Sequence, residues 1–141
     1  MTIPVWILLA FALWTIAVLL GGIGVRRWSQ ILTGRAQISD FHADEPQGSP
    51  AYRRAMRAHA NCVENLPVYG AIVFALGAAQ LTSPTLDAMA IVFMIARVGQ
   101  SLVHMLFEET NTTVAIRFGF FFVQIAVMLW MGITVIAAQS A

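Results

Sequence analysis

Charged residues are scarce in this chain, where they make up 11% of 141 residues. A soluble domain carries about 25% charged residues, and no segment here is polar enough to form a separate soluble module. Apolar residues reach 59%, and the mean hydropathy is +0.76. Because such a surface suits lipid rather than water, the composition predicts a single integral membrane domain over residues 1–141.

Lysine is absent, and all eight basic residues are arginines. Arginine keeps its charge at any accessible pH and offers a planar fork to carboxylates, which suits partly buried anion sites. A genome that favours arginine codons would explain the same bias. The net charge of +1 gives no sign of a nucleic-acid partner, and none is expected. The single cysteine, Cys62, excludes an internal disulfide.

Most of the chain consists of long hydrophobic runs. The first covers about 3–25, which is 23 residues without a charge, and about 20 helical residues cross the ~30 Å hydrocarbon core. Turn signals at 80–84 and 108–113 separate three further runs, at about 56–81, 86–107 and 114–138. The sequence therefore predicts an all-α integral membrane bundle of four transmembrane helices.

The only extended polar segment is the loop predicted at about 26–55. Most of the arginines lie in this loop or at its ends, at positions 26, 27, 35, 53, 54 and 57. The positive-inside rule places such a segment in the cytoplasm. Four spans then put both termini on the opposite face and the 108–113 turn in the cytoplasm. We expect a multi-pass protein of a bacterial inner membrane.

Several polar residues interrupt the hydrophobic runs, where a charge costs ~2.5–3.5 kcal/mol on insertion scales and by default marks a functional or pairing site. Arg57, Asn61 and Glu64 are spaced to share one face of the second helix. Arg97 lies near the middle of the third span, and Arg117 lies just inside the fourth.

The antiparallel order of the helices brings these positions to similar depths. Glu64 and Arg97 both fall roughly 12–15 Å from the cytoplasmic surface, so they are predicted to form an ion pair. His104 and Arg117 fall close to the level of Arg57. A purely structural pair would account for Glu64 and Arg97. The excess of arginine over acid within the spans instead implies an anionic ligand or carboxylates from a neighbouring subunit.

The segment from Arg57 to Pro67 resembles the MAPEG family, the membrane-associated proteins of eicosanoid and glutathione metabolism. The family pattern has an arginine, then His or Gln two residues later, then Asn, then Glu. Arg57, His59, Asn61 and Glu64 fit it. The resemblance extends to residues of the third and fourth spans and covers essentially the whole chain.

This resemblance implies a homotrimer of four-helix subunits in membrane lipid, with glutathione bound as co-substrate between subunits at the cytoplasmic end. Arg117 is then the catalytic candidate, because a guanidinium beside the glutathione thiol raises its thiolate fraction. The candidates for holding the peptide are Arg27, Arg57, Asn61, Glu64, Arg97 and His104.

The function expected from the resemblance is that of a glutathione-dependent transferase or peroxidase acting on lipophilic electrophiles or lipid hydroperoxides. The alternative is a non-catalytic lipid-binding or accessory membrane protein. No metal site is expected, because His42 and the neighbouring loop acids have no spacing typical of one. Glu108 and Glu109 are expected in a solvated turn, with pairing of Glu108 to Arg53 or Arg54 as the alternative.

The orientation can be tested directly. A reporter fused after Ala141 should appear on the non-cytoplasmic face, and one inserted near Gly48 should appear in the cytoplasm, because the arginines cluster between the first two spans. A cytoplasmic C-terminal reporter would refute both the count of four spans and the placement of the site.

Overall fold

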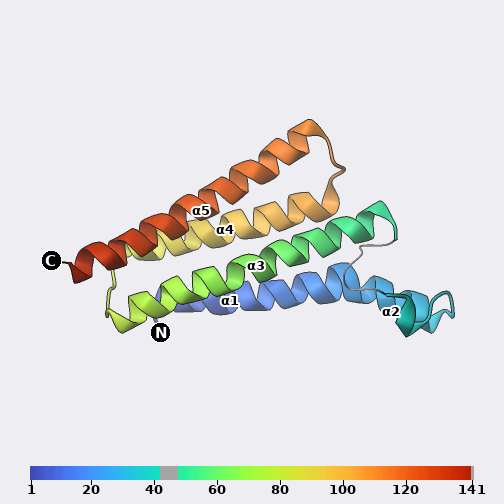
Figure 1. Ribbon diagram of the computed structural model, residues 1–141, viewed down its shortest axis with the longest axis horizontal. Helices are drawn as coiled ribbons and strands as arrows, with labels where there is room; N and C mark the ends of the chain where they lie inside the picture. The colour runs from blue at the N-terminus through green and yellow to red at the C-terminus, as the bar shows by residue number, and fades with distance from the viewer. Residues whose placement is uncertain (42–47, 141) are drawn as a thin grey trace.

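The computed structural model describes residues 1–41 and 48–140, and every regular element in this part of the chain is helical. Four long helical rods lie side by side, with both termini at the same end of the bundle (Figure 1). The all-α four-helix bundle is thus confirmed. The elements are α1 (Ile3–Val18), the π-helix η1 (Leu19–Gly24), α2 (Val25–Leu32), the 3-10 turn η2 (Ile38–Asp40), α3 (Pro50–Ala78), α4 (Pro84–Leu106) and α5 (Asn111–Gln139).

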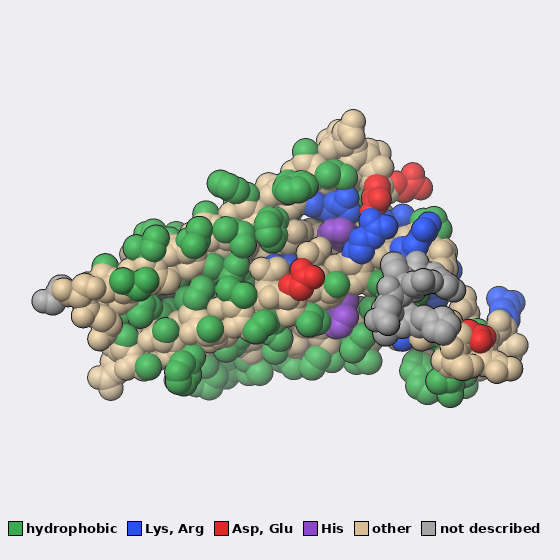
Figure 2. Space-filling model, viewed as in Figure 1, with side chains coloured by type: hydrophobic (Ala, Val, Ile, Leu, Met, Phe, Trp, Pro, Cys, Tyr) green, Lys and Arg blue, Asp and Glu red, His purple; other side chains and the backbone are tan. Residues whose placement is uncertain are grey.

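Three of these rods are long and apolar enough to cross a membrane: Ile3–Leu32, α4 and α5. The remaining rod, α3, has 29 residues and is about 43 Å long. Charges such as Arg57 and Glu64 make its first half too polar to qualify by composition. The prediction of four apolar spans is therefore confirmed for three helices, and α3 packs among them. Apolar side chains are spread along the visible length of the bundle, and most charged ones gather at one end (Figure 2).

The helices extend beyond the hydrophobic runs because polar residues cap their first turns. The Ser49 hydroxyl accepts a hydrogen bond from the Tyr52 amide at 3.3 Å, so α3 begins at Pro50, before the predicted span. At the other side of the loop, the first rod continues to Leu32. Residues 26–32 and 50–55 of the predicted loop thus belong to helices, and His42 lies outside the described residues.

Two glycines bring the helices close at the charged end. A Cβ added to Gly22 would lie 3.0 Å from the Ala55 Cβ, so this glycine sets the approach of the first rod to α3. A Cβ added to Gly99 would lie 2.9 Å from ring atoms of Phe120, so the ring would have to shift if this position of α4 carried a side chain. The next residue along α4, Gln100, faces α5 and bonds to Arg117 and Gln124 there.

Arg97 is fully buried in the middle of the bundle, with 0% of its surface exposed. Its guanidinium carbon lies 5.3 Å from the centroid of the Phe11 ring, and its Nη1 donates to the Asn61 carbonyl at 3.3 Å. Within the described residues, its Nε and Nη2 meet no hydrogen-bond partner. The packing against Phe11 and the backbone contact therefore hold Arg97 in place.

The predicted ion pair between Glu64 and Arg97 is wrong. Glu64 is exposed, and in the part of the chain that the structure describes neither residue takes part in an ion pair. Glu64 and Arg97 lie at similar depths along their helix axes, but Glu64 lies on a side of α3 that does not face Arg97. Glu64 follows the buried Cys62 by two residues, which is about 200° around the helix, so it faces away from the core.

A double-mutant cycle tests this correction. Glu64→Gln and Arg97→Met should change the free energy of unfolding additively, within about 0.5 kcal/mol, because the side chains do not touch. Arg97→Met alone should be tolerated or stabilising, since it replaces an unpaired buried charge by an apolar chain of similar size. Stability can be measured by SDS titration in mixed micelles. A coupling of more than about 1 kcal/mol would restore the ion pair.

Candidate functional site

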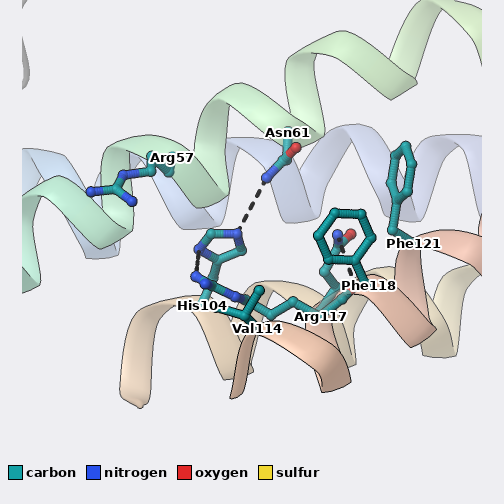
Figure 3. A pocket seen from close by; sticks show the side chains of 8 residues that line it. Arg57, Asn61, His104, Val114, Arg117, Phe118 and Phe121 are labelled. Carbon is teal, nitrogen blue, oxygen red and sulfur yellow. Dashed lines mark hydrogen bonds between the residues drawn. The ribbon is translucent and has the colours of Figure 1, made fainter. Parts of the chain in front are cut away.

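A pocket of about 260 Å³ opens between α3, α4 and α5 toward the charged end of the bundle (Figure 3). One part of its wall is polar and another part is apolar, with Phe118 and Phe121 lying at the opposite side from Arg57 in this view. The lining residues are Arg57 and Asn61 from α3, Gln100 and His104 from α4, and Val114, Arg117, Phe118 and Phe121 from α5.

A chain of hydrogen bonds links the three helices through His104. Arg117 Nη1 lies 2.9 Å from His104 Nδ1, and the Asn61 side-chain amide lies 3.4 Å from His104 Nε2. A guanidinium can only donate, so Nδ1 must accept and the imidazole proton must lie on Nε2. The Asn61 atom that faces Nε2 is the amide nitrogen Nδ2, which also donates, so the amide group has to turn over for its oxygen to accept this N–H. His104 is therefore neutral in this arrangement and holds the guanidinium of Arg117 in place.

Gln100 joins α4 to α5 on the same side of the pocket. Its Nε2 donates to the Arg117 carbonyl at 3.4 Å, and its Oε1 accepts from Gln124 Nε2 at 3.1 Å. Gln124 is fully buried and also donates to the Phe120 carbonyl at 3.0 Å. These bonds anchor the first half of α5, so the backbone that carries Arg117 has a fixed position beside α4.

One carboxylate faces two of the arginines. Glu109, in the turn between α4 and α5, forms an ion pair with Arg57, and its Oε1 lies 3.8 Å from Arg117 Nη1. Arg117 thus has an acidic neighbour within one subunit, and this residue comes from the turn between α4 and α5 rather than from a span. The pairing of Glu108 with Arg53 or Arg54 is not found among the described residues; the arginine pairs are formed by Glu109. The sequence does indicate that Glu109 lies near Arg57, because the antiparallel order of the helices places this turn at the level of Arg57.

The apolar wall of the pocket was not predicted. Val114, Phe118 and Phe121 lie four and three residues apart on α5, so they share one helix face with Arg117. That spacing is visible in the sequence, but a hydrophobic stripe on a membrane helix gives no indication by itself of whether it faces lipid, core or a pocket. In the structure this face of α5 is directed toward α3 and lines the pocket.

Four of the seven predicted site residues therefore meet in one pocket: Arg57, Asn61, His104 and Arg117. Arg97 adjoins it only through its bond to the Asn61 carbonyl. The other two, Arg27 and Glu64, do not line it. Arg27 lies on α2, where its Nε donates to the Tyr52 hydroxyl and its guanidinium carbon lies 5.3 Å from the centroid of the Phe41 ring. Within one subunit, Arg27 and Glu64 thus belong to other surfaces.

The charges of the pocket define what it can bind. Arg57 and Arg117 contribute two positive charges and Glu109 one negative charge, while His104 is neutral. The side chain of Arg117 is only 12% exposed, whereas that of Arg57 is 48% exposed. An anionic group is therefore favoured both at the water-accessible rim and deeper in the pocket, next to the aromatic side chains.

Comparison with known proteins gives one result at the level of the family. Neither the curated proteins nor the solved structures contain a match to this chain. Residues 4–137, nearly the whole chain, match the model of the MAPEG family, in agreement with the segment from Arg57 to Glu64 and with the helical bundle. The chain is an integral membrane protein and belongs to the MAPEG family.

Proposed function

We propose that the protein binds glutathione in the pocket between α3, α4 and α5 and activates its thiol against lipophilic substrates. The observation that carries this proposal is the position of Arg117. Its guanidinium is largely shielded from water and held by His104, and it lines the same pocket as Phe118 and Phe121. A cation that stabilises a thiolate thus lies beside a surface suited to an apolar substrate.

The polar wall matches the functional groups of glutathione. The peptide has two carboxylates, and the forked guanidinium of Arg57 at the pocket rim suits a carboxylate. Its amides can exchange hydrogen bonds with the side chains of Asn61 and Gln100, which line the pocket. A carboxylate held by Arg57 leaves the rest of the peptide free to extend toward Arg117.

The thiol is the group that Arg117 would activate. A free thiol has a pKa of about 8.5, and a neighbouring guanidinium lowers that pKa, so more thiolate is present at neutral pH. With an electrophile, the thiolate sulfur forms a bond to carbon as the leaving group departs with the bonding electrons. With a lipid hydroperoxide, the sulfur attacks the terminal oxygen, the lipid alcohol leaves, and a second glutathione yields the disulfide and water.

The exposed position of Glu64 supports assembly into a homotrimer. This carboxylate lies on the outer face of α3, within the predicted span, where contact with lipid would be costly. A neighbouring subunit that covers α3 would shield it, and could bring its own Arg27 toward the pocket. We propose a trimer in a bacterial inner membrane, with the pocket opening toward the cytoplasm, where the positive-inside rule places the arginines.

The alternative is a non-catalytic, lipid-binding member of the family. It would use the apolar wall of the pocket but would have no need to create a thiolate. The absorbance of the thiolate near 240 nm separates the two functions, because lipid binding leaves it unchanged.

Substitution of Arg117 tests the proposed role. Arg117→Leu should fold, yet its bound glutathione should show no thiolate absorbance at neutral pH. Conjugation of a lipophilic halonitroarene should fall about 100-fold, as when one stabilising donor is lost. Arg117→Lys should keep part of both signals, because it keeps a point charge and loses the fork.

Two further comparisons make this test specific. Arg57→Ala and Asn61→Ala should raise the dissociation constant of glutathione and leave the thiolate signal of the bound peptide largely intact. Arg35→Leu, an exposed loop substitution that removes the same charge, should change neither quantity. If the unmodified protein shows no thiolate with millimolar glutathione, the enzymatic function is refuted.

A further inference from the structure

Glu109 occupies the place of an anionic ligand between the two arginines of the pocket. A single oxygen, Oε1, faces Nη1 of Arg57 and Nη1 of Arg117. The three residues come from three separate elements: α3, α5 and the turn that joins α4 to α5. Glu108, the neighbouring acid in the same turn, makes neither contact in the part of the chain that the structure describes.

We propose that Glu109 is an internal competitor for the Arg57–Arg117 pair, which an incoming carboxylate displaces, and that it thereby determines which anions the pocket accepts. This inference rests on the proposed function for the identity of the ligand. The contact between Glu109 and the arginines does not depend on it. The competition follows from the geometry, because two carboxylates cannot both take the same face of Arg57.

The ion pair is of a kind that exchanges readily. The side chains of Arg57 and Glu109 are 48% and 42% exposed, so the pair lies at the water-accessible rim of the pocket. Exposed ion pairs of this sort contribute little to stability because water and salt screen them. The contact between Arg117 and Glu109 is longer, at 3.8 Å, and places a negative charge beside the candidate thiolate position.

The charge balance explains why Glu109 has to move. With Glu109 in place, the pocket offers one net positive charge. A ligand that brings a carboxylate to Arg57 and a thiolate to Arg117 carries two negative charges, which need two positive charges to offset them. Ligands with only one anionic group can enter without displacing Glu109, whereas the thiolate form of glutathione cannot. Glu109 thus lowers the affinity most for ligands that must displace it, which are those that bring a carboxylate to Arg57 and a thiolate to Arg117.

A second cavity next to the pocket offers the displaced carboxylate a new position. It measures about 290 Å³ and is lined by Pro50, Arg53, Arg54 and Arg57 together with Glu108 and Glu109. The turn itself has no need to unfold, because Thr110 and Thr113 cap α5 with bonds independent of the Glu109 side chain. Rotation of one side chain therefore moves the negative charge from Arg57 and Arg117 toward Arg53 and Arg54.

The test compares Glu109→Gln with Glu108→Gln. Both remove one negative charge from the same turn and the same second cavity, but only Glu109 contacts Arg57 and Arg117. Calorimetric titration with glutathione, in lipid nanodiscs at fixed ionic strength, should show about three- to tenfold tighter binding for Glu109→Gln. Glu108→Gln should bind like the unmodified protein.

A second measurement needs no glutathione. The rate at which phenylglyoxal modifies Arg57 and Arg117, read by peptide mass spectrometry, should rise in Glu109→Gln and stay unchanged in Glu108→Gln. This measurement separates the two proposals. If no variant binds glutathione but the arginines become more reactive only in Glu109→Gln, the proposed function fails and the competitor role of Glu109 stands.

Three results would overturn the inference. Weaker glutathione binding in Glu109→Gln would make Glu109 a ligand of the peptide's ammonium group instead of a competitor. Equal affinities in the two variants would show that the contact exerts no competition. Unchanged arginine reactivity in a folded Glu109→Gln variant, with the thermal midpoint of the unmodified protein, would show that the ion pair does not protect the arginines.

Discussion

A guanidinium placed inside a membrane bundle must have its charge offset by its surroundings, and this constraint organises the whole structure. Arg57, Arg97 and Arg117 lie on three different helices. Arg97 is completely enclosed and rests on the Phe11 ring and the backbone carbonyl of Asn61. Arg57 and Arg117 lie nearer the end of the bundle and share Glu109. The pocket forms where these two charges are only partly offset.

The sequence was sufficient to predict the bundle and the core of the site. Helical periodicity places Arg57 and Asn61 on one face of α3, and the antiparallel order of helices then places His104 and Arg117 at the same level. Both inferences use only the rise and the turn of a regular helix, which vary little from protein to protein. The four residues do meet in one pocket, as this geometry requires.

The predictions from the sequence were wrong where the contact of a side chain depended on its direction around the helix axis as well as on its depth along that axis. Glu64 and Arg97 match in depth, but Glu64 faces outward while Arg97 is enclosed. Direction around an axis depends on how the helices pack, which in turn depends on contacts such as Gly99 against Phe120. Glu109 was missed for a related reason, because the direction of a side chain in a turn does not follow from a helical repeat.

The arrangement joins two requirements of the proposed chemistry in one small space. Arg117 needs shielding from water to act strongly on a thiol, and an apolar substrate needs an apolar surface. The Arg117 side chain is only 12% exposed, and the stripe of Val114, Phe118 and Phe121 on the same helix provides the apolar surface. Gln100, Gln124 and His104 then hold this part of α5 in position. Each of these roles belongs to a single subunit, while Glu64 and Arg27 do not line the pocket.

The most direct test is an experimental structure of the protein in lipid nanodiscs with glutathione bound. The account predicts that the sulfur lies within hydrogen-bond distance of the Arg117 guanidinium, beside Phe118 and Phe121, and that a glutathione carboxylate replaces Glu109 at Arg57. Glutathione bound elsewhere, or with its sulfur directed away from Arg117 while Glu109 still pairs with Arg57, would contradict it.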